Sequence, residues 1–420
     1  MFCNDDWKSA KFGRATAWLT ALAIGLAAPE ALAVAFNWTG GVDDNWADAG
    51  NWDQPSFPNA VDAQVTINAG ASVDLNASVD IESLSLGAGN TLNFLNSRDI
   101  TANTGPISND GTINMNSLGS LTDLSFVGAQ TLSGSGQLLL SDNTGNRIFT
   151  NNTVLTQAAP HTIRGAGQLL ANTGGLINQG SILAEGANVL VIDPNALGFV
   201  NQATLQASGS GGLQFNAGTF TNTGQTIQVD AGSKLNVLSG ATIVNGTLQT
   251  TGSGFVQVNS GSTFDDIRLD GQASHANAQD TTILNGLIND GTWSLNSLGS
   301  LTEMTFSGAQ TLSGSGEVVM SDNTGNRVLT SNTVLTQAAG HTIRGAGQLL
   351  GNSGGLINQG SILAEGANVL VIDPNGLGFV NQATLQASGS GGLQFNAGTF
   401  TNTGQTIQVD AGSKLNVLSG

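Results

Sequence analysis

Short runs of alternating apolar and polar residues recur along most of the chain. Leu213-Gln214-Phe215, Ile227-Gln228-Val229 and Leu235-Asn236-Val237 each place two apolar side chains on one face and a polar one on the other. This period of two is typical of β-strands, and Gly, Asn, Asp and Ser fill the turn positions between the runs. The pattern predicts short strands wound into coils, in which each strand pairs with its equivalents above and below at about 4.8 Å.

A recurring asparagine sets the length of the expected coil. Asn178, Asn201, Asn222 and Asn245 follow apolar residues in similar phrases, at nearly constant steps along the chain. The sequence therefore predicts an all-β parallel β-helix, or β-solenoid, with coils of about 22 residues. We expect a structural role for these asparagines, either as a ladder of amides bonded from coil to coil or as turn residues in the αL conformation.

The sequence also repeats over a period much longer than one coil. This period equals the interval that separates His161 from His341. Residues 161–240 and 341–420 are the same sequence apart from three changes, Ala171/Gly351, Thr173/Ser353 and Ala196/Gly376. Eight coils fill one period, and such self-similarity is typical of arrays. We assign unit 1 to residues 107–286 and an incomplete unit 2 to residues 287–420. Because unit 2 stops within the repeat, we expect a fragment, a truncated reading frame or one slice of a longer array.

Residues 34–106 differ in composition from the units that follow. They hold Trp38, Trp46 and Trp52, together with Pro55 and Pro58. A solenoid must cover its first coil, because an open strand edge pairs with other chains. We therefore predict an N-terminal cap followed by the first coils in this segment.

Residues 1–33 have the features of a secretory signal peptide. Lys8, Lys11 and Arg14 precede an apolar core at 17–28, and Ala31-Leu32-Ala33 fits a small-x-small cleavage site. The core is short for a membrane span, and no later segment is long and apolar enough for one. Cys3, the single cysteine, lies in the segment expected to be removed. We predict a secreted or surface-located mature chain without a thiol, a disulfide or a transmembrane segment.

Charge narrows the classes of partner. The chain carries 11 Lys and Arg against 29 Asp and Glu, a net charge of −18. Such a chain is repelled by nucleic acid and attracts divalent cations loosely. Only 10% of residues are charged and 39% are hydrophobic, which disfavours both disorder and a helical fold.

Candidates for catalysis are few. His161 and His341 are one site in two copies, each followed three positions later by Arg164 or Arg344. A nucleophile–base pair would need further groups close in space, so we interpret the histidines as solvated residues at coil corners. His275 is isolated, and the three histidines lack the spacing of metal ligands.

Three further motifs have a functional and a structural interpretation. The phrase 142–147, repeated at 322–327, is rich in oxygen ligands and is a weak candidate for calcium, although a polar turn is favoured. Glu185 and Asp193 are a conceivable carboxylate pair for glycoside cleavage. Gly165-Ala166-Gly167 resembles part of a phosphate loop but lacks the lysine and the strand–helix context. We assign no catalytic, cofactor-binding or metal-binding residue.

Several phrases resemble the repeats of known surface proteins. LINQGSILAEGANVLVI, FVNQATLQASGSGGLQF, FTNTGQTIQVDAGSKL and GAQTLSGSGQLLL are similar to repeats of bacterial autotransporter passengers, filamentous-haemagglutinin-like adhesins and related PEP-CTERM-sorted proteins. The opening FNWTGGVDDNWADAGNW resembles the segment often found before them. The resemblance implies a right-handed parallel β-helix, export from a Gram-negative bacterium and a role in adhesion or surface structure.

The expected function is therefore that of a non-catalytic adhesin or extracellular stalk at the cell surface or outer membrane. Its partners would be surface glycans, matrix or other cells, bound by many weak contacts along a polar face. The alternative is a polysaccharide-active lyase or hydrolase, since such enzymes also use parallel β-helices, and its support is analogy of fold. A third interpretation is a truncated fragment of a longer autotransporter-like protein.

Overall fold

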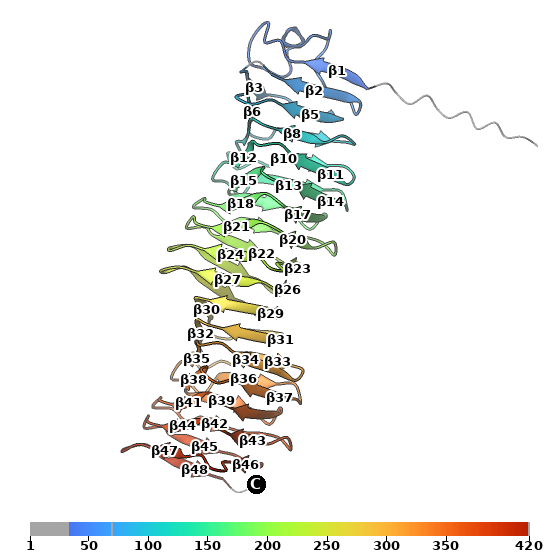
Figure 1. The fold of residues 1–420 in the computed structure, drawn as a ribbon. Helices are drawn as coiled ribbons and strands as arrows, with labels where there is room; N and C mark the ends of the chain where they lie inside the picture. Colours follow the sequence, from blue (N-terminus) through green and yellow to red (C-terminus); the bar gives the residue numbers. More distant parts are fainter. Residues whose placement is uncertain (1–32, 69, 419–420) are drawn as a thin grey trace, which may run out of the picture. The chain divides into compact units, whose positions relative to one another are not determined.

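The computed structural model describes residues 33–68 and 70–418. The predicted signal peptide, residues 1–33, and Cys3 lie outside the described residues, with the exception of Ala33. The described chain is nearly all β and forms a parallel β-solenoid of about 15 turns that lie about 23 residues apart, as the sequence predicted (Figure 1). Its one helical element is a single 3-10 turn, η1 (Ala49–Asn51).

Each coil contributes one strand to each of three parallel faces, which we name X, Y and Z. Faces X and Y form one sheet because two long strands, β29 (Ser262–Asp270) and β31 (Asp280–Asn289), contribute to both of them. Face Z is a separate sheet.

Face X also holds β1 (Val34–Asn37), β2 (Ala63–Ile67), β5 (Ser83–Leu86), β8 (Ile107–Asn109), β11 (Gln130–Ser133), β14 (Val154–Gln157), β17 (Gly175–Asn178), β20 (Phe199–Asn201), β23 (Gly218–Thr221), β26 (Ala241–Val244), β33 (Thr302–Ser307), β36 (Asn326–Thr330), β39 (Gly347–Leu350), β42 (Leu370–Ile372), β45 (Leu393–Phe395) and β48 (Leu415–Val417). Face Y also holds β3 (Ser72–Leu75), β6 (Thr91–Phe94), β9 (Thr112–Met115), β12 (Gln137–Leu140), β15 (Thr162–Gly165), β18 (Ser181–Ala184), β21 (Thr204–Ala207), β24 (Thr226–Val229), β27 (Thr247–Thr250), β34 (Gln310–Ser313), β37 (Val334–Gln337), β40 (Gly355–Asn358), β43 (Phe379–Asn381) and β46 (Phe400–Thr401). Face Z holds β4 (Val79–Ile81), β7 (Ile100–Ala102), β10 (Thr122–Phe126), β13 (Asn146–Thr150), β16 (Gly167–Leu169), β19 (Leu190–Ile192), β22 (Leu213–Phe215), β25 (Lys234–Val237), β28 (Phe255–Val258), β30 (Gln272–His275), β32 (Thr292–Leu295), β35 (Glu317–Met320), β38 (Thr342–Gly345), β41 (Ser361–Ala364), β44 (Thr384–Ala387) and β47 (Ile407–Val409).

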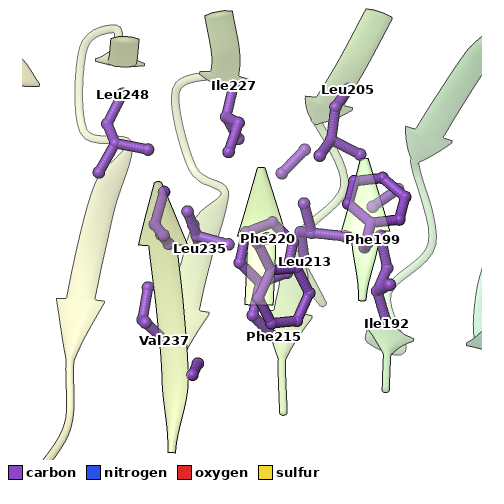
Figure 2. Packing of buried hydrophobic residues seen from close by; sticks show 14 of the residues in the cluster. Ile192, Phe199, Leu205, Leu213, Phe215, Phe220, Ile227, Leu235, Val237 and Leu248 are labelled. Atoms are coloured by element: carbon purple, nitrogen blue, oxygen red, sulfur yellow. The ribbon is translucent and has the colours of Figure 1, made fainter. Parts of the chain in front are cut away.

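The apolar side chains of all three faces meet inside the coil (Figure 2). Alternation decides this, because every second residue of a strand points inward, and most of these inward residues are apolar. Phe199 and Phe220 are neighbours in adjacent coils, and Phe215 stacks on Phe220 with ring centroids 4.0 Å apart. The interior is therefore a continuous, mainly apolar column, and the outward members of the strands, most of them polar, meet solvent.

The segment before the first complete coil packs three tryptophans against the stack. Trp46 and Trp52 are buried, and Trp52 lies 5.0 Å from both Trp38 and Trp46, measured between ring centroids. Their indole groups stay satisfied, since Trp46 donates to the Pro58 carbonyl at 3.0 Å and Trp52 to the Trp46 carbonyl at 2.8 Å. Aromatic bulk thus covers the coil that begins at β2.

The two sequence units do not lie on the same faces. Strand β15 of unit 1 is on face Y, whereas its counterpart in unit 2, β38, pairs within face Z. Between Ile107 and Gly286, which are all described, the chain forms 25 strand segments when the two halves of β29 and the first half of β31 are counted separately. Three segments make a coil, so one unit completes eight coils and one further face. The expectation of a whole number of coils per unit is therefore wrong.

Tight corners account for the extra strand. Strands β29 and β31 turn from face X to face Y at Asp266 and Asn285, which adopt the αL conformation with φ of 53° and 56°. The coil that runs from Asp265 to its partner Leu284 is shorter than the coil that runs from Leu132 to its partner Gln157. Short coils at the end of unit 1 thus fit one more strand into the unit.

Candidate functional site

His161 and His341 lie inside the solenoid, so the prediction of solvated corner residues is wrong. Both side chains are fully buried, and Nε2 of His161 lies 3.1 Å from Nδ2 of Asn109. His341 repeats this contact with Asn289 at 3.1 Å. Burial lowers the pKa of each histidine to about 4, which keeps both imidazoles neutral near pH 7. Arg164 follows on the outer side of β15, so it cannot act on the same substrate as His161.

His275 is also a core residue. It points inward from β30, and its Nδ1 accepts a hydrogen bond of 3.1 Å from Nε1 of Trp293 in the next coil. Complete burial lowers its pKa to about 3. The three histidines therefore serve the packing of the column.

The asparagines fulfil both structural predictions, at different positions. Asn178 donates to Asn201 at 2.7 Å, and Asn201 donates to Asn222 at 2.8 Å, in a buried ladder. The next member, Asn245, is instead an αL corner residue with φ of 60°. The ladder returns in unit 2, at the positions Asn358, Asn381 and Asn402.

The oxygen-rich loop at 142–147 uses its oxygens within the protein. Asp142 accepts from the backbone N–H of Asn188 at 2.7 Å, and the side chain of Asn143 accepts from Gly145 and Ser117. Arg147 forms an ion pair with Asp123. This loop ties together corners of coils that are not neighbours. In the described part of the chain, no group of three or more His, Cys, Asp or Glu side chains is placed to share a metal ion.

Glu185 and Asp193 do not come together. Glu185 pairs with Arg164 over face Y at 2.8 Å, whereas Asp193 accepts a long hydrogen bond of 3.4 Å from Gln168 of face Z. Gly165-Ala166-Gly167 is the tight corner between β15 and β16, and a side chain at Gly165 would collide with the Leu140 carbonyl. Glycine is therefore needed here by the close approach of the neighbouring coil.

The surface of face Y carries a row of hydroxyl groups that sequence reasoning missed. Successive outward positions along nine coils hold eight hydroxyls and one glutamine, and they lie about 4.8 Å apart. Backbone pairing sets their register from coil to coil. We name this set the Y row: Ser72, Thr91, Thr112, Gln137, Thr162, Ser181, Thr204, Thr226 and Thr247.

Two further rows continue it around the solenoid. The X row lies on face X and begins in the coils where the Y row ends. It consists of Thr219, Thr242, Thr263, Thr282 and Thr305. The Z row lies on face Z and holds the unit 2 counterparts of the Y row: Thr292, Glu317, Thr342, Ser361 and Thr384. Because the unit advances by one face, the same sequence presents its hydroxyls in a new direction.

Shallow hollows lie beside two of these rows. One is lined by Thr91, Thr112, Gln137 and Thr162 of the Y row, together with corner residues such as Asp110. Another is lined by Thr384 of the Z row and by Thr406 and Gln408 of the next coil. Both are open and polar, which suits contact with an extended ligand better than enclosure of a small molecule.

Most arginines of the coils are paired with carboxylates. Arg147, Arg164 and Arg268 each form an ion pair in unit 1, and Arg327 and Arg344 do so in unit 2. Hydrogen bonds from Asn45 and Asn51 lower the pKa of Asp43 in the N-terminal segment. The surface therefore offers few free cations to an anionic ligand.

The sequence contained a signal for the Y row, since Thr or Ser opens eight of the nine face Y strands from β3 to β27. What it lacked was the register that places these residues above one another. Among residues 33–68 and 70–418, no helix is long and apolar enough to cross a bilayer. No protein-family model, no curated protein and no solved structure matches this chain.

Proposed function

We propose that this protein is an exported β-solenoid stalk at the bacterial cell surface, and that it acts in adhesion through its outer faces without catalysis. The observation that carries the proposal is the repetition of coil geometry between units 1 and 2. Residues 161–238 and 341–418 form corresponding parallel ladders although they lie on different faces. A unit can thus be added without disturbing the column, which is how a spacer is lengthened.

The roles of the candidate residues support the same proposal. The histidines belong to the core, Glu185 is paired with an arginine, and Asp142 holds two coil corners together. Each of these groups has a structural partner or place that explains its presence. The remaining polar surface is repetitive, which favours many weak contacts over one strong site.

Surface shaving of intact cells tests the proposal. Protease added outside the cells is expected to release peptides from residues 34–420, and none should come from residues 1–33 if that segment is removed on export. A cytoplasmic protein serves as the control for lysis. Recovery of the protein only from the cytoplasm, with Met1 retained, would contradict the proposal.

A further inference from the structure

We infer that the X, Y and Z rows are binding surfaces for linear neutral polysaccharides, and that together they hold separate polymer chains on different sides of the solenoid. This inference deepens the proposed function, because it names the class of partner that the stalk contacts. It rests on the chemistry of the rows, on the charge of the protein and on the one-face advance between units.

The hydroxyls of the rows are available for a ligand. In the Y row, the described hydrogen bonds use the hydroxyls of Ser72 and Thr112, which accept from Asn93 at 3.3 Å and from Gln137 at 3.5 Å. The other hydroxyls face outward without a protein partner among the described residues. A hydroxyl both donates and accepts, so a row of them can exchange hydrogen bonds with the hydroxyls of a sugar polymer.

A second outward row on face Y holds amides near both ends, separated by Leu139, Arg164 and Leu183 in the middle coils. Asn93 and Asn114 lie next to each other, with Asn114 donating to Asn93 at 2.9 Å. Further along, Gln206 and Gln228 both donate to Asp230. These bonds fix the amide orientations, so the face presents an ordered array of donors and acceptors and loses little entropy when a ligand binds.

Charge selects a neutral polymer. The chain has a net charge of −18, and five of the six arginines among the described residues are paired with carboxylates. An acidic polysaccharide would meet repulsion along the whole length of the stalk. The one carboxylate of the Z row, Glu317, is matched by Arg344 at 2.7 Å.

The shape of the rows selects a polymer over a small sugar. The Y row spans eight steps of about 4.8 Å, or roughly 38 Å, on an open face. A single sugar would make few contacts there, whereas an extended chain repeats the same contact from coil to coil. Because the three rows lie on three faces, one straight polymer cannot follow all of them, and the protein would join two or more chains.

Retention of the purified chain on a panel of insoluble linear neutral polysaccharides (cellulose, chitin and mannan) tests the inference. Soluble polygalacturonate serves as the acidic competitor. We expect retention on at least one neutral polymer and no release when polygalacturonate is added. The variant with Thr112, Thr162, Thr204, Thr226 and Thr247 changed to Val should bind about tenfold more weakly, because it removes five contacts of one multivalent surface.

Changing the same five threonines to Ser is the matched control, since serine keeps the hydroxyl while valine keeps the branched shape. Binding should survive in the Ser variant, and circular dichroism should show that both variants keep the β fold. Equal binding by the Val and Ser variants, release by polygalacturonate, or no retention on any neutral polymer would each overturn the inference. Self-association of the chain without polymer would assign the rows to contacts between copies instead. None of these outcomes depends on where the protein resides in the cell, so failure here and failure of surface shaving are separate results.

Discussion

Units 1 and 2 share most of their sequence and differ in where that sequence lies. Strand β18 in unit 1 and its counterpart β41 in unit 2 have the same residues, yet β18 belongs to face Y and β41 to face Z. Their buried positions are the same in both places, as Ile182 and Ile362 are both fully buried. A strand of this solenoid therefore encodes which side points inward and does not encode which face it joins.

The partners of Arg164 and its unit 2 counterpart Arg344 show that the change of face keeps local contacts, whereas a substitution alters them. Arg164 pairs with Glu185 at 2.8 Å, whereas Arg344 pairs with Glu317 at 2.7 Å and lies 3.6 Å from Glu365. The difference arises because Glu317 replaces Gln137 of unit 1. Strands that are adjacent in the ladder shift together when unit 2 advances by one face. Contacts between their side chains are therefore kept, and only the side of the solenoid on which they lie changes.

The largest expected effect comes from deletion of residues 107–286, which joins Pro106 to Leu287. Unit 2 should then take the faces of unit 1, and Ser294 should lie beside Asn93 as Asn114 does in the whole chain. In a Cys3→Ser background, Asn93→Cys and Ser294→Cys should form a disulfide in the deletion variant, because adjacent strands are within reach.

The undeleted chain with the same two cysteines is the control, since there Ser294 pairs with Ser274 and not with Asn93. Non-reducing electrophoresis and mass spectrometry report the bond. Small-angle X-ray scattering should show a stack shorter by roughly 40 Å. A disulfide in both chains, or in neither, would contradict the assignment of the extra face.

Acidification should weaken both units. His161 and His341 have a folded-state pKa of about 4, below the ordinary value of 6.5. Between these values the unfolded chain binds more protons, so stability falls as pH falls from about 6.5 to about 4. The loss approaches roughly 3 kcal/mol for each histidine.

Urea unfolding between pH 7 and pH 4 measures this loss. The variant carrying His161→Gln and His341→Gln keeps an acceptor for Asn109 and Asn289 but does not titrate in this range. It should lose less stability on acidification than the unmodified chain. An identical pH dependence in both proteins would show that His161 and His341 are not the cause.

Breaking the asparagine ladder should cost more in unit 1 than in unit 2. Asn201→Ala leaves an amide hydrogen of Asn178 and the side-chain oxygen of Asn222 unpaired, and Asn222 is buried. We expect a loss of about 2 kcal/mol or more in the local opening free energy, read from amide hydrogen exchange of β20 and β23.

Asn381→Ala is the matched change in unit 2. Its partner Asn402 is only half-buried, so water can replace the lost bond, and the expected loss is about 1 kcal/mol. An equal loss at both positions would indicate that exposure does not control the cost.

The smallest effect is expected from exchanging the residues that distinguish the ion pairs. Glu317→Gln removes one partner of Arg344, but Glu365 remains within 3.6 Å and can take its place. Because these side chains are about one-third exposed, the change should cost less than about 1 kcal/mol and shrink with added salt. Thermal unfolding at low and high salt measures this change in stability. Gln137→Glu is the reciprocal change in unit 1. A larger loss that does not depend on salt would contradict the assignment of a surface ion pair.

Much of the fold was predictable, because its signals are local. Alternation in runs such as Leu213-Gln214-Phe215 sets which side chains are buried, and the asparagine spacing indicated the coil length. The asparagine ladder was one of two structural interpretations. The ladder is found at Asn178, Asn201 and Asn222, and the αL turn is found at Asn245. The prediction for His161 failed because burial at a corner depends on residues from other coils, here Asn109, which lies 52 residues earlier in the chain.

The sequence by itself determined that strands alternate, that coils stack in parallel and that a long unit recurs. Only the tertiary structure decided which face each strand occupies. That choice depends on the total number of strands that precede it, and each αL corner, such as those at Asp266 and Asn285, changes the length of chain needed for a turn. Since any face buries the same apolar pattern equally well, no local signal records the direction in which the polar side chains point.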